Sequence, residues 1–124
     1  MRIFKTKLFA RFARGQRIAD RVLREAVERA GRGLVDADLG GGVVKQRVAR
    51  AGQGRSGGFR VLLAFRSRDR AVFIYGFAKN ERENVDDKEL RTLREIATAW
   101  LSADIAHIER EIANGRLQEV PNDG

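Results

Sequence analysis

Seven basic side chains in the middle of the chain occur at positions from which they can converge on one surface: Lys45, Arg47, Arg50, Arg55, Arg60, Lys79 and Arg82. In an extended strand, Lys45 and Arg47 point to the same face, about 6 to 7 Å apart. Arg60 stands in an apolar run between Phe59 and Val61, where a guanidinium needs water, a carboxylate or a phosphate. The set predicts a groove that binds phosphate. The alternative is a solvated basic face without chemistry.

The charge of the chain is concentrated in the same region. The 124 residues carry a net charge of +8, and residues 43–82 alone hold ten basic residues against two acidic ones, Asp69 and Glu81. This imbalance favours an anionic partner such as nucleic acid, a phosphorylated ligand or an acidic protein. The length fits one domain over residues 1–124.

Several classes of site are excluded or disfavoured by composition. The chain has no cysteine and one histidine, His107, which rules out thiolate zinc sites and cysteine nucleophiles and leaves little for a metal centre. We therefore expect no metal and no cofactor. The longest apolar run, 71–78, is too short for a membrane span, and no signal peptide is evident. We expect a cytoplasmic protein without membrane contact.

Other motifs favour structural interpretations. The glycine spacing in 52–57 matches a dinucleotide fingerprint, but a strand-like run follows it where a helix is required, so we expect a flexible basic hairpin loop. Tyr75 is expected to share a strand face with Phe73 and Phe77 and to pack in the core. His107 lies in an acidic segment far along the chain from the basic set, which argues against a general base there.

The elements that must position these side chains follow from hydrophobic periodicity. A strand is expected at 2–5, a helix from Thr6 to Gly15 and a second helix at 18–30, which together predict a helical hairpin. Residues 36–42 read as a loop. Strands are expected at 43–49, 59–66 and 71–78, mainly antiparallel, with the last one central and buried on both faces.

The C-terminal third predicts a helix. Asp86 and Glu89 have the spacing of a capping box, and an apolar stripe runs from Leu90 to Leu101. The helix is expected to continue or restart beyond residue 105 and to close at Asn114. Residues 120–124 are expected to fray. The fold class is α+β, a helical hairpin on a small, mainly antiparallel sheet with a C-terminal helix.

Three runs of residues resemble the RelE/HigB superfamily of type II toxin–antitoxin toxins. They are KQRVAR at 45–50, GQGRSGGFR at 52–60 and YGFAKNEREN at 75–84. The last run is most similar to the HigB-like branch, and the order of elements agrees over most of the chain. The resemblance implies a RelE-like fold.

The resemblance also implies an activity and partners. It implies a ribosome-dependent endoribonuclease that cuts mRNA in the ribosomal A site without a metal and is neutralised by a cognate antitoxin. Such cleavage requires a proton acceptor for the ribose 2′-OH, cations around the phosphorane-like transition state and a donor for the 5′-oxygen. Clustered lysines and arginines can supply these groups.

Carried over by position, Lys45, Arg47, Arg60, Lys79 and Arg82 are the implied catalytic residues. Further RNA contacts are expected at Arg50, Arg55 and Arg66. Two departures leave the acid and the base open: Asn80 replaces an arginine of RelE, and the C-terminal tyrosine of RelE has no counterpart. A ParE-like gyrase toxin, a non-catalytic nucleic-acid-binding module and an inactive toxin remain alternatives.

Overall fold

The computed structural model describes residues 1–50 and 57–121. Within them the elements follow the order β1 (Arg2–Thr6), α1 (Lys7–Gly15), α2 (Asp20–Gly31), β2 (Ala37–Gly40), β3 (Val43–Val48), β4 (Phe59–Arg66), β5 (Arg70–Ala78), α3 (Asp87–Ser102), α4 (Ile105–Ala113) and β6 (Leu117–Val120). The fold is α+β, as predicted. The glycine-rich stretch 51–56, which contains the expected flexible loop and Arg55, lies outside the described part, as do the last residues, 122–124.

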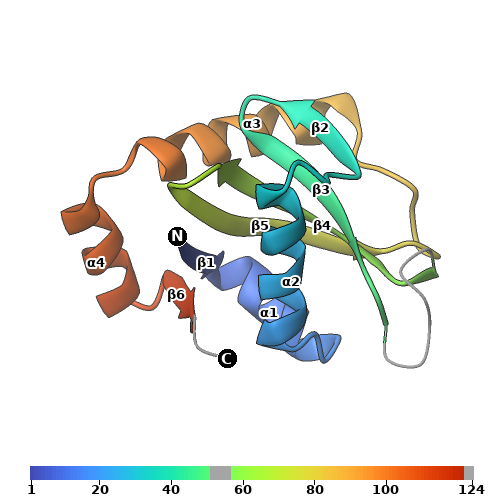
Figure 1. The fold of residues 1–124 in the computed structure, drawn as a ribbon, viewed down its shortest axis with the longest axis horizontal. Coiled ribbons are helices and arrows are strands. Elements are labelled where there is room, and N and C mark those ends of the chain that lie inside the picture. The colour runs from blue at the N-terminus through green and yellow to red at the C-terminus, as the bar shows by residue number, and fades with distance from the viewer. Residues whose placement is uncertain (51–56, 122–124) are drawn as a thin grey trace.

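The sheet is mixed. Its strands lie in the order β2-β3-β4-β5-β1-β6, and all neighbours are antiparallel except β1 and β5, which are parallel. The three strands predicted in the middle of the chain form its centre in the expected antiparallel arrangement. β1 lies between β5 and β6, so the two ends of the chain close one side of the sheet (Figure 1).

Helices cover both faces of this sheet. α1 and α2 pack on one face through a core that includes Phe9, Val27 and Leu63. α3 and α4 pack on the other face through a second core that includes Leu62, Leu93 and Ile108 (Figure 1). α1 rests mainly on β5 and β1, whereas α2 rests on β3. The predicted helical hairpin is therefore not confirmed, because each helix packs on the sheet.

Local capping signals are confirmed. Thr6 Oγ1 accepts a hydrogen bond from the Phe9 amide at 3.2 Å, and Asp86 and Glu89 form the predicted capping box at the start of α3. The C-terminal helix restarts at Ile105, because Ala103 adopts an extended conformation and Asp104 caps α4.

Two short strands were not expected. Ala37–Gly40 forms β2 where a loop was predicted, and the following turn uses positive φ at Gly40, Gly41 and Gly42, a conformation that glycine adopts at little cost. Leu117–Val120 forms β6, so Val120 belongs to a strand and the expected fraying at that residue is wrong. Both strands lie at the sheet edges.

A β-bulge changes the expected faces of β5. Leu62 pairs with Tyr75 and Leu63 pairs with Phe73, which leaves Ile74 as the extra residue. A bulge of this kind breaks the two-residue alternation of the strand. Phe73 therefore lies in the α1/α2 core, while Tyr75 and Phe77 lie on the α3 face, and the prediction that all three share a face is wrong.

No helix of the described residues is both long and apolar enough to cross a membrane.

Candidate functional site

A row of side chains crosses three central strands on the α3 face of the sheet. Arg47 of β3 pairs in register with Arg60 of β4, which pairs with Phe77 of β5. Directly opposed residues place their Cβ atoms about 4.5 to 5.5 Å apart. Two predicted cations are therefore neighbours because of strand register, as the sequence pattern indicated.

Burial separates these two arginines. The side chain of Arg47 is 51% exposed, whereas Arg60 is only 5% exposed. Burial lowers the pKa of Arg60, and the charge of Arg47 lowers it further, while Asp36 and Glu83 act in the opposite direction. A buried guanidinium beside a second cation is an electrostatically costly arrangement that a bound anion relieves.

The next row contains Lys45, Leu62 and Tyr75. Lys45 is half-buried, two residues from Arg47 on the same face. Tyr75 is also half-buried, but instead of packing wholly in the core it lines a cavity of about 270 Å³ beside Glu89. The other residues that line the cavity, Lys88, Thr92 and Leu93, belong to α3.

Arg82 is held between β5 and α3. Its Nη2 lies 2.5 Å from Glu89 Oε1, its Nε donates to the Asn84 carbonyl at 2.9 Å, and its guanidinium lies 5.6 Å from the centre of the Phe77 ring. The hydrogen bond from Arg82 lowers the pKa of Glu89 to about 2, with help from the Asp86 amide. The capping box of α3 therefore also fixes a cation beside the Arg47–Arg60 row.

Lys79 reaches the same end of the sheet. It follows β5 directly and its side chain is exposed. Its amide donates to the Gly58 carbonyl at 3.0 Å, which places it opposite the residue before β4. Gly58 is required there, because a Cβ would lie 2.2 Å from the Val48 carbonyl oxygen.

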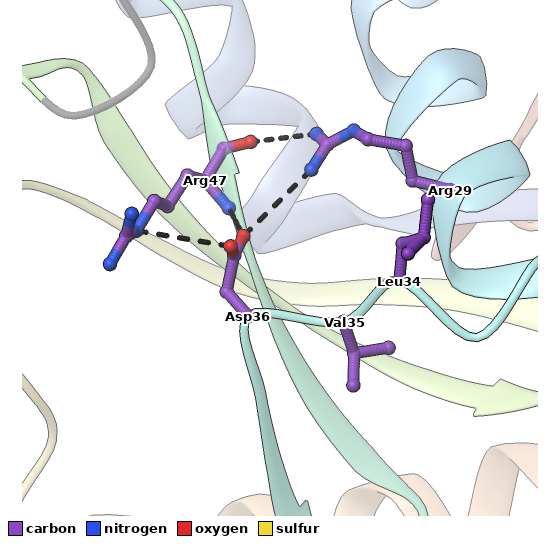
Figure 2. A pocket seen from close by; sticks show the side chains of 5 residues that line it. All are labelled: Arg29, Leu34, Val35, Asp36 and Arg47. Atoms are coloured by element: carbon purple, nitrogen blue, oxygen red, sulfur yellow. Dashed lines mark hydrogen bonds and ion pairs between the residues drawn. The ribbon is translucent and has the colours of Figure 1, made fainter.

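Arg47 is fixed by two residues that sequence reasoning missed, Arg29 and Asp36. The Arg47 amide donates to Asp36 Oδ2 at 2.5 Å, and its carbonyl accepts from Arg29 Nη2 at 2.8 Å. Figure 2 shows the two side chains meeting the backbone of Arg47 beside a cavity of about 470 Å³ that Leu34 and Val35 also line. β2 pairs with β3 only as far as Lys45. At Arg47 the side chains of Arg29 and Asp36 therefore bond to the backbone groups that a neighbouring strand would otherwise bind.

Two of the predicted residues, Arg50 and Arg66, are not brought to this row. Arg50 stacks on the ring of Phe59, 4.8 Å from its centre, and Phe59 packs on the opposite face of the sheet. Arg66 lies at the far end of β4, six residues or roughly 20 Å from Arg60, bonded to Asp69 and to the Leu101 carbonyl. Arg55 lies outside the described residues. His107 stacks on Trp100 in the α3–α4 region, away from the row.

The arrangement suits binding of a phosphodiester. Arg47 and Arg60 provide guanidinium groups on one surface, Lys45 lies in the adjacent row of the same face, and Lys79 directly follows β5. Asp36 and Glu83 act on the charge of Arg60, and Glu89 pairs with Arg82. Among residues 1–50 and 57–121, no three His, Asp or Glu side chains are grouped so that they could hold a metal ion.

The chain matches the model of a known protein family. The family model described as the RelE toxin of the RelE/RelB toxin–antitoxin system matches residues 1–120. No curated protein matches the chain.

Proposed function

The chain belongs to the RelE toxin family of toxin–antitoxin systems, and we propose that it is an endoribonuclease that cuts translated mRNA. The proposed reaction is attack of a ribose 2′-OH on the adjacent phosphate. The proposed setting is the ribosomal A site in the cytoplasm, where the ribosome orients the substrate and the toxin supplies the cationic groups. The run at residues 75–84 supports membership of the HigB-like branch.

The observation that carries this proposal is the Arg47–Arg60 row. Two guanidinium groups that oppose each other on adjacent strands form a site for a doubly contacted phosphate,. Arg60 is buried at 5% exposure, and the Arg47 side chain is 51% exposed. We assign Arg60 to the scissile phosphate and Arg47 to the charge that develops in the transition state.

We assign the proton transfers from the ability of each side chain to accept or donate a proton. A guanidinium stays charged in proteins and accepts no proton, whereas a lysine amine can act as acceptor or donor. We therefore assign the 2′-OH proton to Lys45, which lies on the same strand and face as Arg47. Lys79 is assigned as donor to the departing 5′-oxygen. Arg82, bonded to Glu89, is assigned to positioning the RNA beside Phe77.

A partner antitoxin is implied by the family. With a net charge of +8, the toxin is expected to pair with an acidic neutralising protein through complementary charge. Contacts with mRNA and with the ribosome belong to the proposal.

The test is induced expression with mapping of cuts in a translated reporter mRNA. Wild type is compared with Arg60→Ala and with Arg66→Ala, which removes an arginine from the other end of the same strand. We expect growth arrest and discrete cuts for wild type and Arg66→Ala, and loss of both for Arg60→Ala. Thermal unfolding of each purified protein checks that the variants fold.

Other outcomes would replace the proposal. Arrest without mRNA cuts would indicate a ParE-like action on gyrase or another target. Absence of arrest and of cuts with well-folded wild type would indicate a non-catalytic module or an inactive toxin.

A further inference from the structure

A second surface lies at the β6 edge of the sheet, away from the Arg47–Arg60 row. β6 is the outermost strand on this side and is flanked by α1 and α4 (Figure 1). Three strand positions separate it from β4, which carries Arg60, a spacing of roughly 14 Å. The two surfaces are therefore separate sites on the sheet.

The outer side of β6 presents backbone groups that no described residue uses. The Lys7 amide bonds to the Arg116 carbonyl at 3.1 Å, which makes this a hydrogen-bonded pair. Because hydrogen-bonded and non-bonded pairs alternate in an antiparallel ladder, Gln118 bonds to β1, while Leu117 and Glu119 direct their N–H and C=O groups outward. An edge of this kind is a template for an added strand.

A groove of about 410 Å³ runs along this edge. Its apolar lining comes from Ala10, Ile112 and Leu117, and its basic rim comes from the exposed side of α1. The helical spacing puts the rim residues on one face of α1. They are Lys7, Arg11 and Arg14.

The rim cations have no counter-charge among the residues that the structure describes. None of their side chains makes a hydrogen bond or an ion pair there. The nearby acids are already committed, since Glu119 is paired with Arg2 at 2.8 Å and Glu111 with Arg116 at 2.7 Å. The groove thus combines unpaired positive charge, an apolar floor and unused backbone groups.

We propose that this groove binds an extended acidic segment of a partner protein, which adds to β6 as a seventh strand. Side chains of an extended segment alternate between its two faces. Acidic residues on one face meet the α1 rim, and apolar residues on the other meet Ile112 and Leu117. The backbone of the segment pairs with Leu117 and Glu119, as in β-strand addition to a sheet edge.

A protein segment fits the groove better than RNA does. RNA phosphates would satisfy the rim cations, but RNA has neither the apolar side chains for Ile112 and Leu117 nor peptide groups in ladder register with Leu117 and Glu119. All three features of the groove are used only by an extended peptide. The proposal does not depend on nuclease activity.

The experiment uses the full chain and a blocked ten-residue peptide of alternating valine and glutamate, followed by fluorescence anisotropy and amide hydrogen exchange. We expect binding that slows exchange of the Leu117 and Glu119 amides. Two N-methylated forms of the peptide are compared, one methylated at its odd-numbered residues and the other at its even-numbered residues. One form is expected not to bind and the other to bind as the parent peptide does, because only one set of amides faces β6.

Charge reversal tests the rim. The double variant Arg11→Glu/Arg14→Glu is expected to weaken peptide binding by about tenfold or more. The control Arg32→Glu/Arg91→Glu changes net charge equally at exposed arginines outside the groove and is expected to bind as wild type does. Thermal unfolding verifies that both fold.

Three results would overturn the proposal: no binding at millimolar peptide, equal loss in both double variants, or unchanged exchange at Leu117 and Glu119 in the bound state. Displacement of the bound peptide by a ten-nucleotide uridine RNA, with the same dependence on Arg11 and Arg14, would assign the rim to nucleic acid instead.

Discussion

Arg47 and Arg60 oppose each other directly on β3 and β4, so two like charges occupy one cross-strand pair. Like charges in this position destabilise a sheet, and burial together with the charge of Arg47 lowers the pKa of Arg60. Asp36, which bonds to the Arg47 backbone, offsets part of this repulsion. The pair therefore costs stability, which is consistent with the phosphate-binding role that we propose for it.

Removing one member of this pair is expected to weaken RNA binding without lowering the stability of the fold. Arg47→Ala should leave the free energy of unfolding unchanged or raise it by up to about 1 kcal/mol, because the opposed charge is lost. The same change should lower the slope of log RNA affinity against log salt by about 0.7, the loss of one single-strand phosphate contact. Urea unfolding and RNA anisotropy across salt measure both quantities. The control Arg110→Ala removes an exposed arginine of α4, and an equal fall in its slope would contradict the assignment.

The Arg82–Glu89 pair predicts a pH dependence. Glu89 has its pKa lowered from 4.5 to about 2 in the folded protein. A carboxyl with a depressed folded pKa stabilises the fold above its unfolded pKa and loses that contribution as pH falls. The difference in melting temperature between wild type and Glu89→Gln should therefore be full above pH 4.5 and shrink toward pH 2.

The matched control for that pair is Glu95→Gln, on the exposed side of the same helix. The difference in melting temperature between wild type and Glu95→Gln should stay small and constant over the same pH range. A Glu89→Gln difference that does not vary with pH would show that the pair contributes little.

The contacts of Arg29 with the end of β3 predict that Arg29→Ala lowers the stability of the fold. This change leaves the Arg47 carbonyl without its 2.8 Å donor and removes one of the two cations beside Asp36, and loss of a buried hydrogen-bonding group costs about 1–3 kcal/mol. Urea unfolding measures the loss. Arg32→Ala, three residues further along and exposed, should change stability by less than about 0.5 kcal/mol; similar losses in both variants would argue against the edge role.

Gly76 is expected to be intolerant of a side chain. A Cβ there would lie 2.4 Å from Cε2 of Phe12, so Gly76→Ala should destabilise the protein by about 1–3 kcal/mol through overpacking. Gly15→Ala serves as the control, since nothing lies within 4 Å of its Cβ position. Guanidinium unfolding of both variants compares them, and equal stability would show that Phe12 moves aside freely.

Sequence reasoning was reliable where the signal is local. The capping box of Asp86 and Glu89 and the cap at Thr6 are confirmed because each depends on residues three apart. The alternation of β3 and β4 correctly placed Lys45, Arg47 and Arg60 on one face, since strand periodicity determines side-chain direction,.

Sequence reasoning was unreliable where the interacting residues lie far apart in the sequence. Arg29 and Asp36 bond to Arg47 across 18 and 11 residues, and no spacing pattern indicates such contacts. The bulge at Ile74 arises from the pairing of β5 with β4, and it moved Tyr75 off the face of Phe73. β2 and β6 were missed because four residues with mixed polarity carry little periodic signal,.

The most direct test of the central claim is cleavage of mRNA on purified, programmed ribosomes. We predict a cut that leaves a 5′-hydroxyl product and that disappears when the attacking ribose is 2′-deoxy or when the toxin carries Arg60→Ala, while Arg66→Ala still cuts. Cleavage of the 2′-deoxy substrate, a 5′-phosphate product or full activity of folded Arg60→Ala would contradict it.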